Sequence, residues 1–288
     1  MRYQLQPIEV GQNLLPASGP ALYTAGPAAR PRLEMRLYQR VMVLIAGLVL
    51  VAPASLMAQT STTQTAPAQA QPAPNPLAQQ CVSDSNPDQR IAACNKFLAS
   101  LPKGDPRIPR VMDARGVAYF SKGEIDRAIL DYNAAIKLNP KDPVAYNNRA
   151  FAHFAESQLD LAIQDYNSAI AIDPKDSVAY TNRGYVYFAS GQRAQAIQDF
   201  SSAIKISPKY IDAYHQRGVA YYLTGKFAPA FADFDTAVKL NPKEADSVYL
   251  RSLASRKLGK TADADRDLAS ARQLDPHIEA AMAKLGLK

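Results

Sequence analysis

The chain contains few of the residues from which catalytic and metal sites are usually built. Its 288 residues include only three histidines and two cysteines. The histidines are scattered along the chain, at His153, His215 and His277. There is no metal-ligand spacing, no glycine-rich phosphate loop, and no serine or cysteine nucleophile with a matching base. We therefore expect a protein that is not an enzyme and that has no cofactor and no metal site.

The sequence also lacks a strong excess of charge. The formal net charge is +7, from 33 lysines and arginines against 26 aspartates and glutamates. Residues 1–58 hold five of the basic and two of the acidic residues, which leaves a net charge of +4 for the rest. So small and dispersed a surplus is a weak signal for nucleic-acid binding. It is typical of a mixed-charge, solvated surface, and we expect no nucleic-acid partner.

A membrane-spanning helix needs roughly 20 consecutive apolar residues, and the apolar run in this chain is shorter. The run VMVLIAGLVLVA covers residues 41–52 and is interrupted at Pro53. Arg36 and Arg40 precede it, and small residues follow it. Positive charge, a short apolar core and small residues, in that order, are typical of a secretory signal peptide.

If translation starts at Met35, the charged segment before the apolar run has the length that is usual for a signal peptide. We therefore interpret residues 1–34 as a disordered, over-long start and residues 35–58 as the signal peptide. Cleavage is expected after Ala58, with Ala54 as the second choice. The mature protein would then be periplasmic or extracellular, with no membrane insertion. The alternative is an uncleaved inner-membrane anchor with residues 1–40 on the cytoplasmic side.

Residues 59–80, QTSTTQTAPAQAQPAPNPLAQQ, contain no charge and almost no large apolar side chain. Such a segment cannot bury enough surface to offset its ordering entropy. We expect a disordered linker rich in Gln, Thr, Ala and Pro, with some extended polyproline character.

Cys81 and Cys94 are the only cysteines, and they lie just after this linker. An even number of cysteines in an exported chain favours a disulfide. The bridge would join two helices that turn near Ser85 and Pro87, and closing so short a loop stabilises by about 3 kcal/mol. The alternative is a pair of reduced, half-buried thiols.

A repeat of 34 residues is the strongest pattern in the chain. A proline recurs at that interval without a slip, at Pro140, Pro174, Pro208, Pro242 and Pro276. When each proline is counted as position 32 of a unit, position 8 is always small: Gly116, Ala150, Gly184, Gly218 and Ser252. Position 20 is alanine in every unit, and position 24 carries a large side chain: Tyr132, Tyr166, Phe200, Phe234 and Leu268. This pattern resembles that of the tetratricopeptide repeat (TPR) family.

The resemblance implies an all-α fold, a right-handed α-solenoid of helix-turn-helix units. It places five units at residues 109–142, 143–176, 177–210, 211–244 and 245–278. Residues 77–108 are interpreted as a degenerate, disulfide-linked N-terminal unit. Residues 279–288 are expected to form a capping helix, because the end units of such an array need a covered apolar face.

The sequence departs from the usual TPR pattern at position 7, which is commonly leucine, and an opposite charge recurs at position 23. Position 7 is arginine and position 23 is aspartate in all five units. Arginine can bond a carboxylate through two parallel N–H groups, so we interpret these residues as structural ion pairs and not as a row of ligand-binding arginines. We expect the pairs to fix register more than to add stability. They are Arg115–Asp131, Arg149–Asp165, Arg183–Asp199, Arg217–Asp233 and Arg251–Asp267.

The resemblance also implies that the first helices of the units line an inner groove that binds a peptide. Positions 2, 5, 9, 12 and 13 would face it, and amides there suit a peptide backbone. Lysine and arginine are nearly absent from these positions, so we do not expect binding of acidic peptide tails. At position 12 the aromatics fit ligand contact and packing between helices equally well. The predicted groove residues are Asn147, Phe151, Phe154, Thr181, Tyr185, Phe188, His215 and Tyr222.

The function predicted from these features is a non-catalytic protein–protein interaction scaffold of the bacterial cell envelope. Its partner would be a protein or peptide bound in the concave groove. The alternatives are a membrane-tethered assembly factor and an accessory or regulatory subunit of an envelope enzyme. Repeat scaffolds share one frame whatever they bind, so the sequence does not identify the partner.

Overall fold

The computed structural model describes residues 75–284, 286 and 287, and this part of the chain folds into thirteen helices. The helices are α2 (Pro76–Ser83), α3 (Pro87–Ser100), α4 (Ile108–Ser121), α5 (Ile125–Leu138), α6 (Pro143–Ala155), α7 (Leu159–Ile172), α8 (Ser177–Ala189), α9 (Arg193–Ile206), α10 (Ile211–Leu223), α11 (Phe227–Leu240), α12 (Ala245–Lys257), α13 (Thr261–Leu274) and α14 (Ile278–Lys284).

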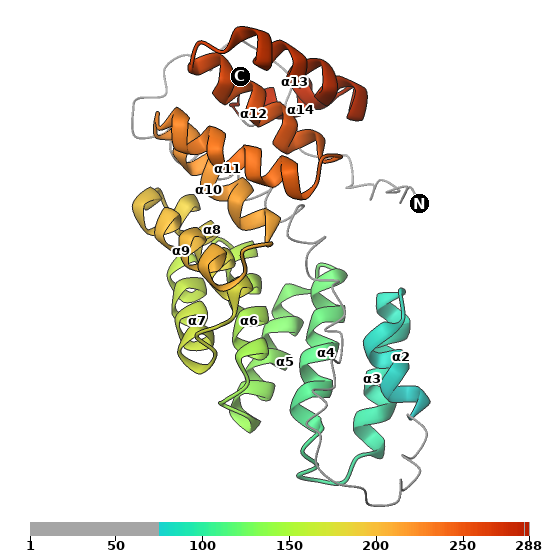
Figure 1. Ribbon diagram of the computed structural model, residues 1–288. Helices are drawn as coiled ribbons and strands as arrows, with labels where there is room; N and C mark the ends of the chain where they lie inside the picture. The colour runs from blue at the N-terminus through green and yellow to red at the C-terminus, as the bar shows by residue number, and fades with distance from the viewer. Residues whose placement is uncertain (1–74, 285, 288) are drawn as a thin grey trace, which may run out of the picture.

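Consecutive helices pack in pairs, and the pairs stack into an elongated, curved array (Figure 1). The main hairpins are α4–α5, α6–α7, α8–α9, α10–α11 and α12–α13, and the second helix of each contacts the first helix of the next. The fold is therefore the right-handed α-solenoid expected from the 34-residue period. Within the described residues, no helix is both long enough and apolar enough to cross a membrane.

Local sequence signals set the helix boundaries. Asp142 caps α6 by accepting a hydrogen bond from the backbone N–H of Val144 at 3.0 Å, and Pro143 occupies the first helical position. The turn inside each hairpin needs a left-handed residue at position 15. Gly123 takes this conformation with φ 78°, and Ser157 takes it in the second unit with φ 62°.

A close contact between the two helices of a unit explains the small residue at position 8. The ring of Phe200 lies against Gly184, and a Cβ added to that glycine would come within 2.6 Å of the ring. The position-24 aromatics of the first four units are at most 2% exposed, so they form the centre of each hairpin. Together with the position-20 alanines, which are also buried, they hold the two helices in close contact.

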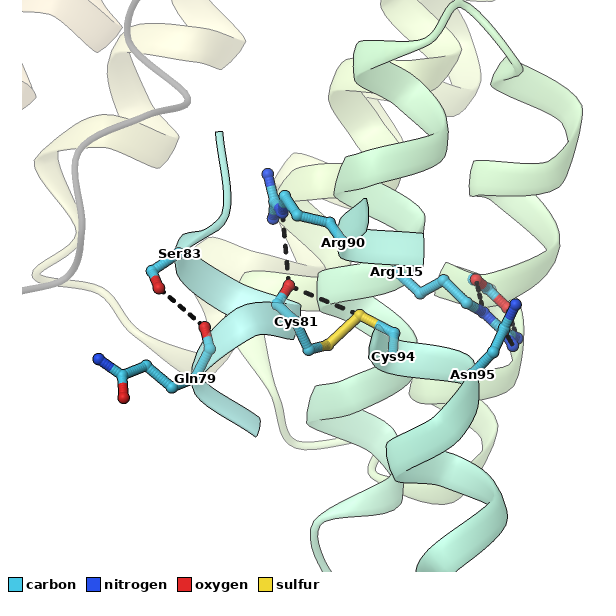
Figure 2. The surroundings of a disulfide bond; sticks show 8 residues. Gln79, Cys81, Ser83, Arg90, Cys94, Asn95 and Arg115 are labelled. Carbon is cyan, nitrogen blue, oxygen red and sulfur yellow. Dashed lines mark hydrogen bonds and ion pairs between the residues drawn. A yellow bond between two sulfur atoms is a disulfide. The ribbon is translucent and has the colours of Figure 1, made fainter. Parts of the chain in front are cut away.

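Both ends of the array are closed. At the C-terminus α14 places Ile278 and Met282 in the core, where they are 0% and 5% exposed. At the N-terminus a disulfide joins Cys81 of α2 to Cys94 of α3 (Figure 2). Figure 2 also shows Arg90, whose Nε donates to the backbone oxygen of Cys81 at 3.3 Å.

The predicted linker is wrong at its C-terminal end, because α2 already begins at Pro76. Asn75 caps that helix by accepting a hydrogen bond from the N–H of Leu77 at 2.9 Å. An N-cap followed by proline is a helix-start signal that overrides the low hydrophobicity of the segment. The predicted start region (1–34), the signal peptide (35–58) and linker residues 59–74 lie outside the described residues.

Each position-7 arginine binds two units at once. In the third unit, Nε and Nη2 of Arg183 donate to the two oxygens of Asp199 at 2.8 and 2.7 Å. Its Nη1 donates to Oδ1 of Asn167, in the preceding unit, at 2.6 Å. The same bidentate geometry recurs in Arg115–Asp131, Arg149–Asp165, Arg217–Asp233 and Arg251–Asp267.

We call this series of arginine contacts the ion-pair ladder. Sequence reasoning missed its third hydrogen bond, which the arginine donates to the preceding unit. For four arginines the acceptor is at position 25 of the preceding unit: Asn133, Asn167, Ser201 and Asp235. For Arg115 it is Asn95, which lies four residues before that place in the 34-residue frame. The polar residue at position 25 of the first four full units was the available signal, and it does not extend to Asn95.

We expect the disulfide to stabilise the N-terminal unit and to have little effect on distant units. Closing a 13-residue separation by the bridge is worth about 3 kcal/mol in the chain-entropy model. Since repeat units contact only their neighbours, reduction should speed hydrogen exchange in α2 and α3 and leave α10 and α11 unchanged. Thiol alkylation of the unreduced protein, followed by mass measurement, should find no free thiol. Two labelled thiols would contradict the bridge.

The ion-pair ladder is tested by a double-mutant cycle at Arg183 and Asp199. Asp199 is 4% exposed, so removing either partner leaves a poorly solvated charge and should cost about 2–4 kcal/mol. Arg183→Leu combined with Asp199→Ala removes both charges and should cost clearly less than the two single changes together. Urea unfolding of the four proteins measures the coupling. Additive costs would mean that the pair contributes no interaction energy.

Candidate functional site

The inner face is formed by the first helices of the units, α4, α6, α8, α10 and α12, each of which contacts the next first helix. The predicted groove residues lie on three of them. Asn147, Phe151 and Phe154 belong to α6, Thr181, Tyr185 and Phe188 to α8, and His215 and Tyr222 to α10. The period of the repeat brings them to equivalent places on successive helices.

Six of these eight residues are buried, so their side chains pack inside the array. At position 12, Phe154, Phe188 and Tyr222 are 3%, 8% and 8% exposed and belong to the main hydrophobic cluster. The ring of Tyr222 packs edge-on against Phe227 with 5.4 Å between centroids. Thr181 is fully buried, and its hydroxyl donates to a backbone oxygen of the preceding turn. The structure thus places the position-12 aromatics among the packing residues, which was one of the two readings the sequence allowed.

Asn147 of α6 is a polar group with unused hydrogen-bonding capacity. Its Nδ2 donates to Asp176 at 3.0 Å, which fixes the amide. Its Oδ1 is buried and has no hydrogen-bond partner in the described part of the chain. The neighbouring Asn148 is occupied, because its Nδ2 donates to both oxygens of Asp113 at 2.9 and 3.1 Å.

Asp113 of α4 is a half-buried carboxylate on the same face. Burial raises its pKa to about 6, and repulsion from Asp142 adds to this shift. The hydrogen bond from Asn148 and the positive charge of Arg110 act in the opposite direction without cancelling it.

A second polar group lies where α8 meets α10. The hydroxyl of Tyr185 contacts both oxygens of Asp212 at 2.7 Å. Nε2 of Gln216 lies 3.4 Å from Oδ1 of Asp212, and Oε1 of the same amide is buried without a partner among the described residues. Burial raises the pKa of Asp212 against the opposing effects of Tyr185 and His215.

His215 joins α10 to α12 through a chain of hydrogen bonds. The hydroxyl of Ser247 donates to Glu244 at 2.9 Å, because a carboxylate only accepts. Ser247 must therefore accept at its 2.9 Å contact with Nδ1 of His215, which fixes the proton on Nδ1. The inner face thus carries fixed amides, an oriented imidazole and several carboxylates.

Family models match the centre of the chain. A model described as TPR repeat matches residues 116–157, 152–191 and 184–225, and one described as tetratricopeptide repeat matches residues 211–244. The chain is a tetratricopeptide repeat protein.

Solved structures with a similar fold agree with this assignment. A crystal structure of MamA is 22% identical with a TM-score of 0.52, and covers 59% of this TPR chain and 96% of its own. MamA 41-end from Desulfovibrio magneticus RS-1 is 20% identical with a TM-score of 0.51, and the match covers 58% of this chain and 93% of that one. YrrB, described as a TPR protein with an unusual peptide-binding site, is 19% identical with a TM-score of 0.54, and the match covers 67% of this chain and 98% of that one. At these identities the likeness concerns the fold. A search of curated proteins found no match.

Sequence reasoning missed the acidic character of this TPR inner face. Asp212 and Asp246 are both at position 2, and Asp113 is at position 5. The residue types were visible, and position 2 was among those that the family resemblance directs to the groove. Their burial was not visible, because it depends on how closely successive first helices pack. An aspartate on an exposed helix face is ordinary, whereas a partly buried one that forms no ion pair is a candidate for function.

Asp113 should make stability depend on pH. Its pKa is raised from 3.8 to about 6 in the folded state, so its stabilising contribution is present below about pH 4 and lost as the pH rises through about 6. Asp113→Asn should match the wild type at about pH 4 and be more stable by about 1–3 kcal/mol at about pH 8. Urea unfolding at both pH values measures this difference. An equal difference at both would show that Asp113 does not titrate in that range.

Proposed function

We propose that this TPR protein is a non-catalytic scaffold that binds a peptide or protein partner along the inner face of its first helices. The observation that carries the proposal is the state of Asn147. The Nδ2 group of its amide donates to Asp176, and the Oδ1 atom is buried with no hydrogen-bond partner among the described residues.

Buried polar atoms without partners are rare, since each costs about 1–3 kcal/mol of lost solvation. A fixed side-chain amide with a free oxygen is suited to accept an N–H group from a peptide backbone. TPR units typically serve as interaction modules, and YrrB is described as having a peptide-binding site. Both facts support an interaction role for this face.

We further propose that the protein works in the bacterial cell envelope, in the periplasm or outside the cell. The signal-like segment at residues 35–58 and the Cys81–Cys94 disulfide support this location, because disulfides persist in oxidising compartments. A membrane-tethered assembly factor and an accessory subunit of an envelope enzyme are the alternatives, and both would use the same inner face.

A photo-crosslinking side chain placed at Val144 or Val178 tests the binding face. These residues are 53% and 39% exposed at position 2 of α6 and α8, so the substitution should not disturb packing. Leu130, 67% exposed on the second helix α5, is the control site. We expect sites 144 and 178 to capture the same partner protein from an envelope extract and site 130 to capture none. Capture only at site 130 would move binding to the outer face.

The role of Asn147 is tested on the captured partner. Asn147→Ala should weaken capture about tenfold, because a tenfold loss corresponds to about 1.4 kcal/mol, the size of one hydrogen bond. Gln198→Ala, which removes an exposed amide from α9, is the matched control and should have no effect. Unchanged capture by Asn147→Ala would remove the amide from the binding site.

A further inference from the structure

Three carboxylates gather where the first helices of the fourth and fifth units meet. Asp212 lies in the first turn of α10, Asp246 lies in the first turn of α12, and Glu244 is the N-cap residue of α12. We call these three residues the acidic cluster. Both Asp212 and Asp246 lie close enough to His215 and Glu244 for their charges to act on each other.

No lysine or arginine among the described residues forms a hydrogen bond or ion pair with the acidic cluster. Its members instead accept hydrogen bonds from neutral groups: Asp212 from Tyr185 and Gln216, and Glu244 from Ser247. A carboxylate can accept about four hydrogen bonds. Asp212 accepts one hydrogen bond from the Tyr185 hydroxyl and a longer one, at 3.4 Å, from Nε2 of Gln216. Burial raises the pKa of Asp212 and of Asp246, and His215 acts in the opposite direction on both without cancelling the shift.

Gln216 provides an independent sign that this site is incomplete. It is only 4% exposed, and its amide lies against Asp212 through Nε2. Its Oε1 is buried and has no partner among the described residues. The site therefore offers carboxylate oxygens and an amide oxygen, all of which accept hydrogen bonds. A ligand that fits must supply several donors and positive charge.

We infer that the acidic cluster and Gln216 bind a lysine or arginine side chain from a basic segment of the partner protein. The inference rests on the proposed function, because it names the part of the partner that reaches the inner face. An ammonium group has three N–H donors and a guanidinium has five, and neither has an acceptor. The whole chain has a net charge of +7, so attraction of a cation has to come from the local cluster and not from the overall charge.

The test uses three fluorescein-labelled peptides of equal length that differ only in carrying lysine, glutamine or glutamate at the same positions. Fluorescence anisotropy with the purified protein should show the lysine peptide binding about tenfold more tightly than the glutamine peptide, and the glutamate peptide binding most weakly. Asp212→Asn/Asp246→Asn should reduce the lysine preference to about twofold or less. Asp160→Asn, which removes an exposed carboxylate from α7, should leave the preference intact.

A second measurement needs no variant, in case the double variant does not fold. Carbodiimide joins amines to carboxylates that are in contact, and mass spectrometry then locates the coupled residues. Coupling of the lysine peptide to the acidic cluster would support the inference. Equal binding of the three peptides, or coupling confined to exposed carboxylates such as Asp160, would overturn it.

The two proposals fail in different ways. If crosslinkers at 144 and 178 capture no partner, the proposed function is wrong. If they capture a partner whose binding is unchanged in Asp212→Asn/Asp246→Asn, the scaffold function stands and only the basic-segment inference is overturned.

Discussion

The array depends on the hydrogen bonds that the guanidinium group at position 7 donates within its own unit and to the unit before. Arg183 donates two hydrogen bonds to Asp199 in its own unit and a third to Asn167 in the unit before. The rings of Tyr180 and Tyr187 lie 5.5 and 5.7 Å from the same group. One planar, permanently charged guanidinium group therefore fixes how the two helices of a hairpin pack together and how that hairpin packs on the preceding one. A lysine offers no such fixed geometry.

A ladder that links each unit to its predecessor raises the question of how it starts and stops. At the N-terminus, Arg115 finds its third acceptor in Asn95, on the helix that the disulfide ties to α2. The degenerate unit thus supplies the ladder contact that a full unit would supply. At the C-terminus, position 25 of the last unit is Ala269, and α14 closes the array through apolar packing with Ile278. The ladder ends where the hairpins end.

Most of the fold was predictable because it follows from features that recur. The 34-residue period, the small residue at position 8, the Asp142–Pro143 helix start and the two charged rows all repeat along the chain. The predicted linker failed at Pro76, where a local helix-start signal outweighed composition. The inner face was harder to predict. Periodicity indicates which way a residue such as Phe154 or Asp212 points, but not how much of it neighbouring helices cover, and that depends on the packing of whole units.

The same residue type has opposite roles on the two sides of a unit. Asp199 is buried with a guanidinium nitrogen 2.7 Å away, and its equivalents are paired in all five units. Asp212 is half-buried and forms no ion pair with a lysine or arginine of the described chain, and only one other unit has an aspartate at that position. Residues that recur in every unit are those that the solenoid fold requires. A poorly solvated polar residue that occurs in only some units lowers stability, and the solenoid fold does not require it. Asn147, Asp212 and Gln216 belong to this second group, which is why we locate binding there.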